Sequence, residues 1–321
     1  MTPERLFQII DFTAKFLPER LARGIFAVAG TVVGWSNYGG VQQLRTNYDR
    51  IDFQPSWWKK RSRSALGMRH YYRYFYEAFR LPYLSQAQLR ARVSVENIDL
   101  LRQALAEGSV SGALMHMGNW DLAGAWAAQE LGPVHTVAEK LTPETVAQQF
   151  LSLRRSLGMV IYHAVKDQHV IDNLTHDMLA GSCFVPLLCD RDLRATGVEV
   201  PLCGHSVRVA PGPAILAQRT GRPMFPVMCL ADNFKHDRQR VRQAGTTWGI
   251  KIIVGDPIWP AVQPDADKAQ RLADVHRMME QWAAVMSDAL PQYVTHWHML
   301  QKVFVEDLDR GRLARTLKGE K

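Results

Sequence analysis

Short apolar segments and helical segments alternate from about residue 110 onward, and no other feature of the sequence limits the possible folds so strongly. Segments of strand length lie at 111–115, 133–137, 160–162, 183–189, 224–230 and 247–254. Helices are expected at 121–131, 142–157, 169–179 and 210–220, and a last helix from residue 265 is expected to end before Pro291. Because such alternation is typical of a parallel sheet covered by helices, we predict a layered α/β fold with a mostly parallel central sheet.

One catalytic domain with appendages accounts for the chain. We expect residues 1–110 to be mainly helical, residues 111–305 to form the α/β core, and residues 306–321 to form a basic tail. A formal charge of +8 favours anionic partners, and the sequence has no zinc-finger or RNA-binding signature, so we expect no nucleic acid. An anionic membrane surface or a phosphorylated substrate is the expected partner.

The N-terminal region suits a membrane surface. Residues 6–35 and 57–79 both mix apolar and aromatic side chains with Lys and Arg, as helices that rest on anionic lipid do. Ordinary helices packed on the core are the alternative. The longest apolar run, residues 25–35, is shorter than the roughly 20 residues of a spanning helix and does not look like a signal peptide. We therefore expect a peripheral or monotopic protein.

The four cysteines form no CxxC pair and no cluster with zinc-ligand spacing. We expect them to be free thiols in a reducing compartment, and we expect no metal site. Together with the basic charge, this places the protein on the cytoplasmic face of the cell membrane.

His116 follows the first strand-like segment and precedes a helix, at the kind of turn where α/β folds place catalytic groups. Asp121 can accept a hydrogen bond from one imidazole nitrogen, which leaves the other nitrogen free to take a proton from a hydroxyl. Asp121 can equally be a helix cap. Gly118 allows a tight turn, and Asn119 and Trp120 are expected to shape the rim of the site.

The stretch from Leu114 to Asp121, Leu-Met-His-Met-Gly-Asn-Trp-Asp, resembles the HX4D signature of the glycerolipid acyltransferases. It is closer to the branch that contains the lipid A late acyltransferases and the actinobacterial phosphatidylinositol mannoside acyltransferases. Further blocks in the expected order extend the resemblance over about residues 110–304: Glu139-Lys140-Leu141 with Arg154, Cys189 to Leu193 continuing through Gly197 to Gly204, and His296 to Gln301. The Gly-Val-Glu-Val form around Glu199 is similar to the mannoside branch.

The resemblance implies a fold of the glycerol-3-phosphate acyltransferase type and a set of site residues. His116 is expected to act as general base on a hydroxyl that attacks an acyl thioester, with Glu199 or Asp121 as its carboxylate partner. Oxyanion donors are expected among the backbone amides of residues 118–120, Arg154 and Arg191. Substrate-binding residues are expected at Glu139, Arg154, Arg191, Asp190, Asp192, Asn119, Trp120, Arg208 and His298. Surface ion pairs, a plain helix start and structural packing are the alternatives for Asp190 to Asp192, Arg208 and His298.

The resemblance also implies a reaction. It is the transfer of a long-chain, palmitoyl-like acyl group from acyl-CoA to a mannose hydroxyl of a phosphatidylinositol mannoside, with no cofactor besides the co-substrate. The acyl chain is expected to lie near Met115, Trp120, Trp126 and Phe150. A lipid A-type or lysophospholipid acyltransferase is one alternative, and a basic lipid-binding protein without catalysis is another.

Overall fold

The computed structural model describes residues 3–138, 148, 151–152, 154–163, 169–192 and 197–308. Its helices are α1 (Pro3–Phe16), α2 (Glu19–Trp35), α3 (Gly39–Ile51), α4 (Trp57–Arg80), α5 (Gln86–Ala91), α6 (Ile98–Glu107), α7 (Trp120–Glu130), α9 (Val170–Ala180), α10 (Gly212–Thr220), α11 (Arg238–Ala244) and α12 (Lys268–Tyr293). Its strands are β1 (Val93–Glu96), β2 (Val110–Leu114), β3 (Val134–Ala138), β4 (Met159–His163), β5 (Phe184–Leu188), β6 (Val198–Leu202), β7 (His205–Val209), β8 (Met224–Asn233) and β9 (Trp248–Val254).

Seven strands form one sheet in the order β1-β9-β8-β2-β5-β3-β4, and β6 pairs with β7 in a separate two-stranded sheet. In the large sheet the pair β8–β9 is antiparallel, and the other pairs are parallel. All five residues of β2 are buried, as expected for a strand with parallel neighbours and a covered face on each side. The predicted α/β fold with a mostly parallel sheet is therefore confirmed.

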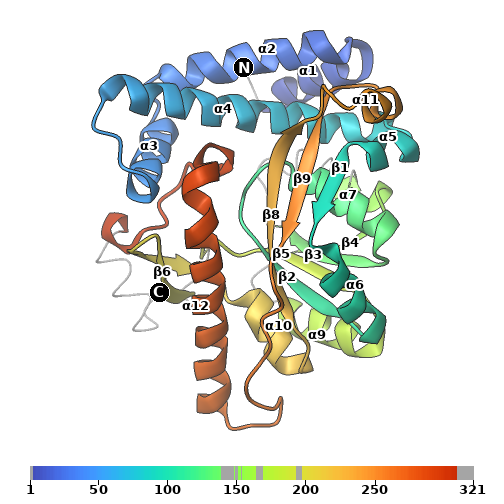
Figure 1. Ribbon diagram of the computed structural model, residues 1–321, viewed down its shortest axis with the longest axis vertical. Helices are drawn as coiled ribbons and strands as arrows, with labels where there is room; N and C mark the ends of the chain where they lie inside the picture. The colour runs from blue at the N-terminus through green and yellow to red at the C-terminus, as the bar shows by residue number, and fades with distance from the viewer. Residues whose placement is uncertain are drawn as a thin grey trace.

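Successive side chains of β2 point to opposite faces of the sheet and enter different cores. Leu114 packs with residues of α6 and α7 on one face, whereas Ala113 and Met115 pack with residues of α3 and α12 on the other. Figure 1 shows α6 and α7 on one side of the strands and the long α12 running down the other side. Helices thus cover both faces of the sheet, and the ends of its strands are where a functional site can form.

The N-terminal helices lie across one end of the sheet, with α2 directly on α4 (Figure 1). Gly30 and Gly34 of α2 face the backbone of Met68 and Ala65 of α4 so closely that a Cβ at either glycine would collide with it. A small-xxx-small spacing allows this approach of two helix backbones. Since the small residues of α2 pack inward, its larger apolar residues face outward.

The observed secondary structure differs from the predicted elements in two places. The N-terminal region contains a strand, β1, which pairs with β9 and so carries the sheet across the predicted boundary at residue 110. The last helix does not stop before Pro291 but includes it and ends at Tyr293. A proline in the last turn leaves the carbonyl of Ser287 without its helical donor, and the Cys203 thiol lies 3.7 Å from that oxygen. Most of the helix predicted at 142–157 lies outside the described residues.

The structure also contains the β6–β7 hairpin, which was not predicted. Its two-residue turn, Cys203 and Gly204, has positive φ at both positions (50° and 81°), as a tight hairpin turn requires. The four cysteines are free, as predicted; Cys203 is half-buried and the other three are buried.

Candidate active site

His116 stands in a tight turn between β2 and α7. Gly118 in this turn has a φ of +58°, and a Cβ there would collide with the backbone carbonyl of Cys229 on β8. Only glycine combines that backbone conformation with that approach. The amide of Gly118 donates to His296 O (3.1 Å), and that of His298 donates to His116 O (2.8 Å). Residues 296–298 therefore hold the turn on either side of Met117.

The carboxylate partner of His116 is Asp190. Strands β2 and β5 are parallel neighbours with Leu114 opposite Leu188, so the residues two positions beyond each strand meet at the same edge of the sheet. There Nδ1–H of His116 donates to Oδ1 of Asp190 (2.6 Å), and the backbone N–H of His116 donates to Oδ2 (3.0 Å). One carboxylate thus fixes both the ring and the backbone of His116.

Electrostatics keep this pair in the arrangement of a base and its counter-charge. Asp190 is only 2% exposed, and its burial alone would raise its pKa. The charge of His116 and the hydrogen bonds from His116 and Trp297 outweigh that effect and lower the pKa of Asp190, so the carboxylate stays ionised. With Nδ1 donating, the lone pair of His116 lies on Nε2, for which the described part of the chain supplies no partner. The imidazole is 29% exposed and can reach a substrate.

Asp121 has a different role from the one expected. Its carboxylate is buried and accepts hydrogen bonds from Arg154 Nε (2.6 Å) and Tyr74 OH (2.8 Å). Burial and the charge of Asp121 raise the pKa of Tyr74; burial lowers that of Arg154, but Asp121 outweighs it and raises that pKa. Because Asp121 is the second residue of α7, its side chain turns toward α4 and away from the His116 Nδ1 position that Asp190 fills. Asp121 therefore connects α4 and the segment around Arg154 to the turn that carries His116.

Glu199 also lies elsewhere than expected. It is exposed on β6 and accepts a hydrogen bond from Ser206 Oγ across the hairpin (2.5 Å). Two other predicted substrate-binding residues, Asp192 and Arg208, form a buried ion pair (3.4 Å) that fixes the start of the same hairpin, where Arg208 also donates to Gly197 O (3.0 Å). These contacts hold the hairpin against the end of β5.

Asn119 and His298 form hydrogen bonds that stabilise the turn. Asn119 caps α7 by accepting from the Leu122 amide (2.9 Å), and it is buried. His298 is also buried, and its Nε2–H donates to Gly118 O (3.2 Å). Burial, with the neighbouring His296, lowers the pKa of His298 to about 3, so it stays neutral at physiological pH. Both side chains are thus buried and stabilise the conformation of the turn.

Two predicted site residues keep positions suited to substrate. Trp120 packs edge-on against the His116 ring, with ring centroids 5.6 Å apart. Arg191 is half-buried at the end of β5, where its charge acts on Tyr71 of α4. Glu139 and Phe150 lie outside the described residues. The roles of these side chains in binding remain predictions.

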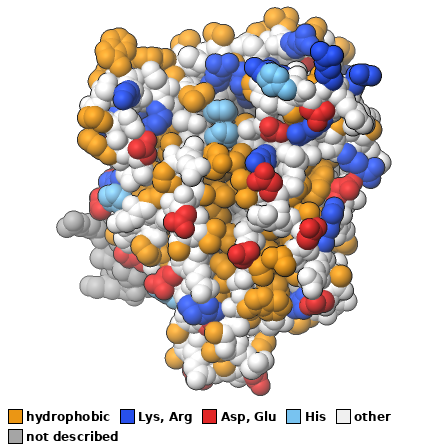
Figure 2. Space-filling model, in the orientation of Figure 1, with side chains coloured by type: hydrophobic (Ala, Val, Ile, Leu, Met, Phe, Trp, Pro, Cys, Tyr) orange, Lys and Arg blue, Asp and Glu red, His pale blue; other side chains and the backbone are white. Residues whose placement is uncertain are grey.

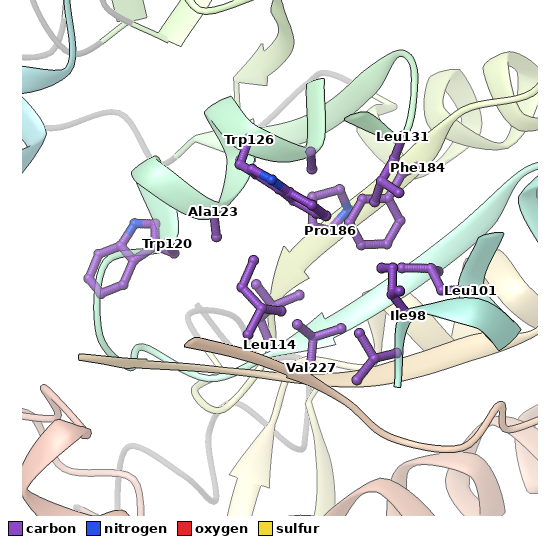
Figure 3. A pocket seen from close by; sticks show the side chains of 14 residues that line it. Ile98, Leu101, Leu114, Trp120, Ala123, Trp126, Leu131, Phe184, Pro186 and Val227 are labelled. Carbon is purple, nitrogen blue, oxygen red and sulfur yellow. The ribbon is translucent and has the colours of Figure 1, made fainter. Parts of the chain in front are cut away.

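An apolar pocket begins at Trp120 and runs between α7 and the sheet. It comprises about 440 Å³ of space, part of it open to solvent. Its lining is formed by Ile98, Leu101, Leu114, Trp120, Ala123, Gly124, Trp126, Ala127, Leu131, Phe184, Pro186, Val227, Ile252 and Val254. Figure 3 shows Trp120 at one end and Leu131, Phe184 and Leu101 toward the other. Of the residues expected near the acyl chain, Trp120 and Trp126 line this pocket, whereas Met115 follows Leu114 in the chain and packs on the opposite face of the sheet.

The described residues contain no group of three or more His, Cys, Asp or Glu side chains placed to hold a metal ion. Within the same residues, no helix combines the length and apolarity needed to cross a bilayer.

At the ends of β2 and β5 an imidazole–carboxylate pair lies beside an apolar pocket, and the comparison with known families identifies the class of protein. The chain matches the family model of the bacterial lipid A biosynthesis acyltransferases over residues 6–306 and belongs to that family. It is an acyltransferase, and the resemblance inferred from the sequence blocks is confirmed.

Two relatives carry the same name, phosphatidylinositol mannoside acyltransferase. The protein from Mycolicibacterium smegmatis is 33% identical over 301 residues, which cover 93% of this chain and 90% of the relative. The protein from Mycobacterium tuberculosis is 30% identical over 302 residues, which cover 93% and 87%. Both support a place in glycolipid biosynthesis. Among solved structures, the 1-acyl-sn-glycerophosphate acyltransferase PlsC from Thermotoga maritima aligns with a TM-score of 0.33 and 10% identity, over 83% of this chain and 96% of that one.

Sequence reasoning missed Asp190 as the partner of His116 and Tyr74 as a partner of Asp121. A signal for Asp190 exists, because it follows an apolar strand at the same offset as His116. Reading that signal requires knowing that β2 and β5 are neighbours. Tyr74 has no local signal, since it is one of several aromatic residues in α4.

Proposed function

We propose that this acyltransferase moves a long-chain acyl group from acyl-CoA to a mannose hydroxyl of a phosphatidylinositol mannoside. The observation that carries the proposal is the imidazole of His116, which Asp190 holds through Nδ1 while no described residue engages Nε2, beside the end of the apolar pocket at Trp120. The names of the two mycobacterial relatives support the acceptor.

The chemistry follows from the pair. A sugar hydroxyl has a pKa far above 7, so it attacks a thioester only if a base removes its proton as the new C–O bond forms. Nε2 of His116 takes this proton, and the negative Asp190 stabilises the imidazolium. The C–S bond then breaks, and the imidazolium returns the proton to the departing coenzyme A thiolate. The acyl group passes directly to the acceptor, and the base is regenerated.

The thioester oxygen gains negative charge during the attack and needs hydrogen-bond donors. The amide of Gly118 is engaged by His296, which leaves the amides of Asn119 and Trp120 and the side chain of Arg191 from the predicted set. We assign the role to the two amides. Both lie at the N-terminus of α7, where the helix dipole also favours an anion. Arg154 is in an ion pair with Asp121, so we assign it a role in stabilising the turn and not in binding the thioester oxygen.

The pocket suits the acyl chain in character, because every residue that lines it is apolar. Each methylene moved from water into such a lining gains about 0.8 kcal/mol. A chain whose thioester lies at His116 can extend past Trp120 along α7 toward Leu131 (Figure 3).

A larger side chain at the far end should therefore shorten the preferred acyl chain. We expect Leu131→Trp to lower kcat/KM for palmitoyl-CoA by about fourfold for each methylene that it displaces, and to leave decanoyl-CoA nearly unaffected. Kinetics across an acyl-CoA series measure this. Leu179→Trp, at an exposed leucine of α9, is the matched control. An unchanged chain-length profile in Leu131→Trp would mean that the acyl chain lies elsewhere.

The N-terminal helices offer a surface for a membrane. On α2 the side chains of Leu21, Ile25, Val28 and Val32 are each at least half exposed, and they lie on one face of the helix. Phe12 and Phe16 on α1 are also exposed, and the cations Lys15 and Arg20 are near them in the chain. Figure 2 shows hydrophobic and basic side chains together along the upper edge of the molecule, where α2 lies in Figure 1.

These features support a peripheral position on an anionic bilayer, with the helices lying in its interface. The free cysteines suit the reducing cytoplasmic side. A lipid acceptor can then reach the site without leaving the membrane.

We expect Ile25→Glu to weaken binding to vesicles of phosphatidylcholine and phosphatidylglycerol by about tenfold or more, since burial of an isoleucine contributes roughly 1.5–3 kcal/mol. Repulsion between the new carboxylate and anionic lipid adds to the loss. Vesicle sedimentation measures it. Leu272→Glu, at an equally exposed leucine of α12, should bind like the unchanged protein. If Ile25→Glu also sediments normally, this face of α2 does not contact lipid.

The reaction is tested with purified protein, radiolabelled palmitoyl-CoA and vesicles that contain phosphatidylinositol mannoside. A labelled, more hydrophobic mannoside is the expected product. Labelling of lysophosphatidate or of a lipid A precursor in its place would give the enzyme a different acceptor. Lipid binding without any transfer would favour a binding protein.

A further inference from the structure

Residues 296–299, here called the C-terminal strap, lie beside the catalytic turn although they are far from it in the sequence. Met117 and Trp297 form an antiparallel bridge, flanked by the two backbone hydrogen bonds that join His116 and Gly118 to the strap. These contacts form a short two-stranded ladder, and the backbone of His116 is part of it. The strap therefore fixes the place where the proposed base stands.

The strap is anchored on its other side to α3. Tyr48 OH donates to Trp297 O (2.9 Å), and Asn47 Nδ2 donates to Met299 O (2.8 Å). The side chain of Trp297 is fully buried, with its ring edge-on to Phe304 at a centroid distance of 6.4 Å. The indole consequently has one orientation.

That orientation directs the indole N–H at Asp190. Trp297 Nε1 donates to Oδ2 of Asp190 (2.7 Å), while Oδ1 accepts from the ring of His116. Two of the hydrogen bonds to this carboxylate come from His116 itself. Among the described residues, Trp297 supplies the only side-chain donor to Asp190 from outside the pair.

We propose that Trp297 is a positioning residue for acyl transfer, whose indole N–H fixes the rotation of the Asp190 carboxylate and keeps it ionised next to His116. The inference rests on the proposed role of His116 as general base. Without this hydrogen bond the Asp190 carboxylate could rotate and would hold the imidazole less firmly. Its negative charge would also be less stabilised, which changes the pH at which the His116–Asp190 pair loses its proton.

The direction of that change follows from the charges. When the imidazole is neutral the pair has a net charge of −1, and when it is protonated the pair is neutral. Loss of a donor to Asp190 destabilises the −1 state more, so the pair retains its proton to higher pH. The neighbouring ionisable groups include Cys189, Arg191, His296 and His298. Burial raises the pKa of the Cys189 thiol and lowers the pKa of His296 to about 4 and that of His298 to about 3, so these three do not titrate near neutrality, and the guanidinium of Arg191 stays charged.

The test is Trp297→Phe in the full-length protein. We expect kcat/KM to fall about tenfold to hundredfold at neutral pH, the range for a lost hydrogen bond to a charged group. The fall should be in kcat, with little change in the KM for palmitoyl-CoA, because Trp297 does not line the pocket. The acidic limb of the rate profile should move to higher pH.

Trp282→Phe is the matched control. Trp282 is also fully buried, and its indole N–H donates to a backbone carbonyl, that of Ala113 (3.1 Å), instead of a carboxylate. The two substitutions remove the same volume and one indole hydrogen bond each. Trp282→Phe should destabilise the protein comparably and leave the acidic limb in place.

A second readout needs no substrate. In ¹⁵N-histidine NMR of the folded protein, the Nδ1 resonance of His116, which reports its hydrogen bond to Asp190, should move in Trp297→Phe and not in Trp282→Phe. If wild-type protein transfers no acyl group but this change is present, the positioning holds and the proposed function fails. Identical rate profiles and resonances in the two variants would reduce Trp297 to a packing residue. Should Trp297→Phe not fold, 3-benzothienylalanine at position 297 keeps the ring shape without the N–H.

Discussion

Replacing His116 with glutamine is expected to lower the rate of acyl transfer by about 10²–10⁴-fold, which is the usual contribution of a general base. Glutamine fills a similar volume but cannot take a proton from a hydroxyl at neutral pH. The imidazole is partly exposed, so the fold should survive the change. Turnover of radiolabelled palmitoyl-CoA measures the loss, and thermal unfolding shows whether the protein remains folded.

His176→Gln is the control for this variant, because His176 lies on α9 with a side chain that is 83% exposed. It should retain full activity. A complementary test is His116→Ala with added imidazole, which should restore part of the rate at the emptied position. Wild-type activity in His116→Gln would disprove the mechanism proposed for this site.

Asp190→Asn is expected to have an effect of the same order, about 10²–10⁴-fold in kcat. An asparagine can turn its NH₂ toward Nδ1 of His116, which then accepts, and the proton moves to Nε2. The lone pair needed to take the proton of the acceptor hydroxyl is then lost. The pH–rate profile and the His116 ¹⁵N shifts of the variant distinguish this tautomer change from unfolding.

Glu199 and Asp121, the two carboxylates that the sequence suggests as partners of His116, provide the comparison. Glu199→Gln should cost less than about twofold, because Glu199 is exposed and its described hydrogen bond comes from Ser206. Asp121→Asn should lower stability by about 3 kcal/mol, because it removes the buried member of the Asp121–Arg154 ion pair. A loss in Glu199→Gln equal to that in Asp190→Asn would return the role to Glu199.

Much of the fold could be predicted because the determining pattern is local. The six apolar segments read as strands correspond to β2, β3, β4, β5, β8 and β9, each within a few residues of its observed ends. Strands buried on both faces consist of continuous apolar residues, and such runs are visible in the sequence itself. β1, β6 and β7 were not predicted, because their sequences Val-Ser-Val-Glu, Val-Glu-Val-Pro-Leu and His-Ser-Val-Arg-Val are interrupted by polar residues or proline and contain no long apolar run.

The sequence alone also determined that His116 stands at a strand-to-helix turn and that the chain resembles a family of acyltransferases. It could not decide which carboxylate faces the imidazole. Asp121 is nearer in the chain, but the start of α7 turns it toward Tyr74 and Arg154. Asp190 is 74 residues away and reaches His116 because two parallel strands pair in one register.

Trp297 shows the same limit more strongly. Nothing local in the sequence links it to residue 190, and its hydrogen bond to Asp190 exists only because the strap folds back over the turn and α3 holds it there. Sequence patterns record the burial and periodicity of neighbouring residues, and these determined the class of fold and the position of the base. The orientation of the base depends on contacts between distant segments, and only the tertiary structure decides those.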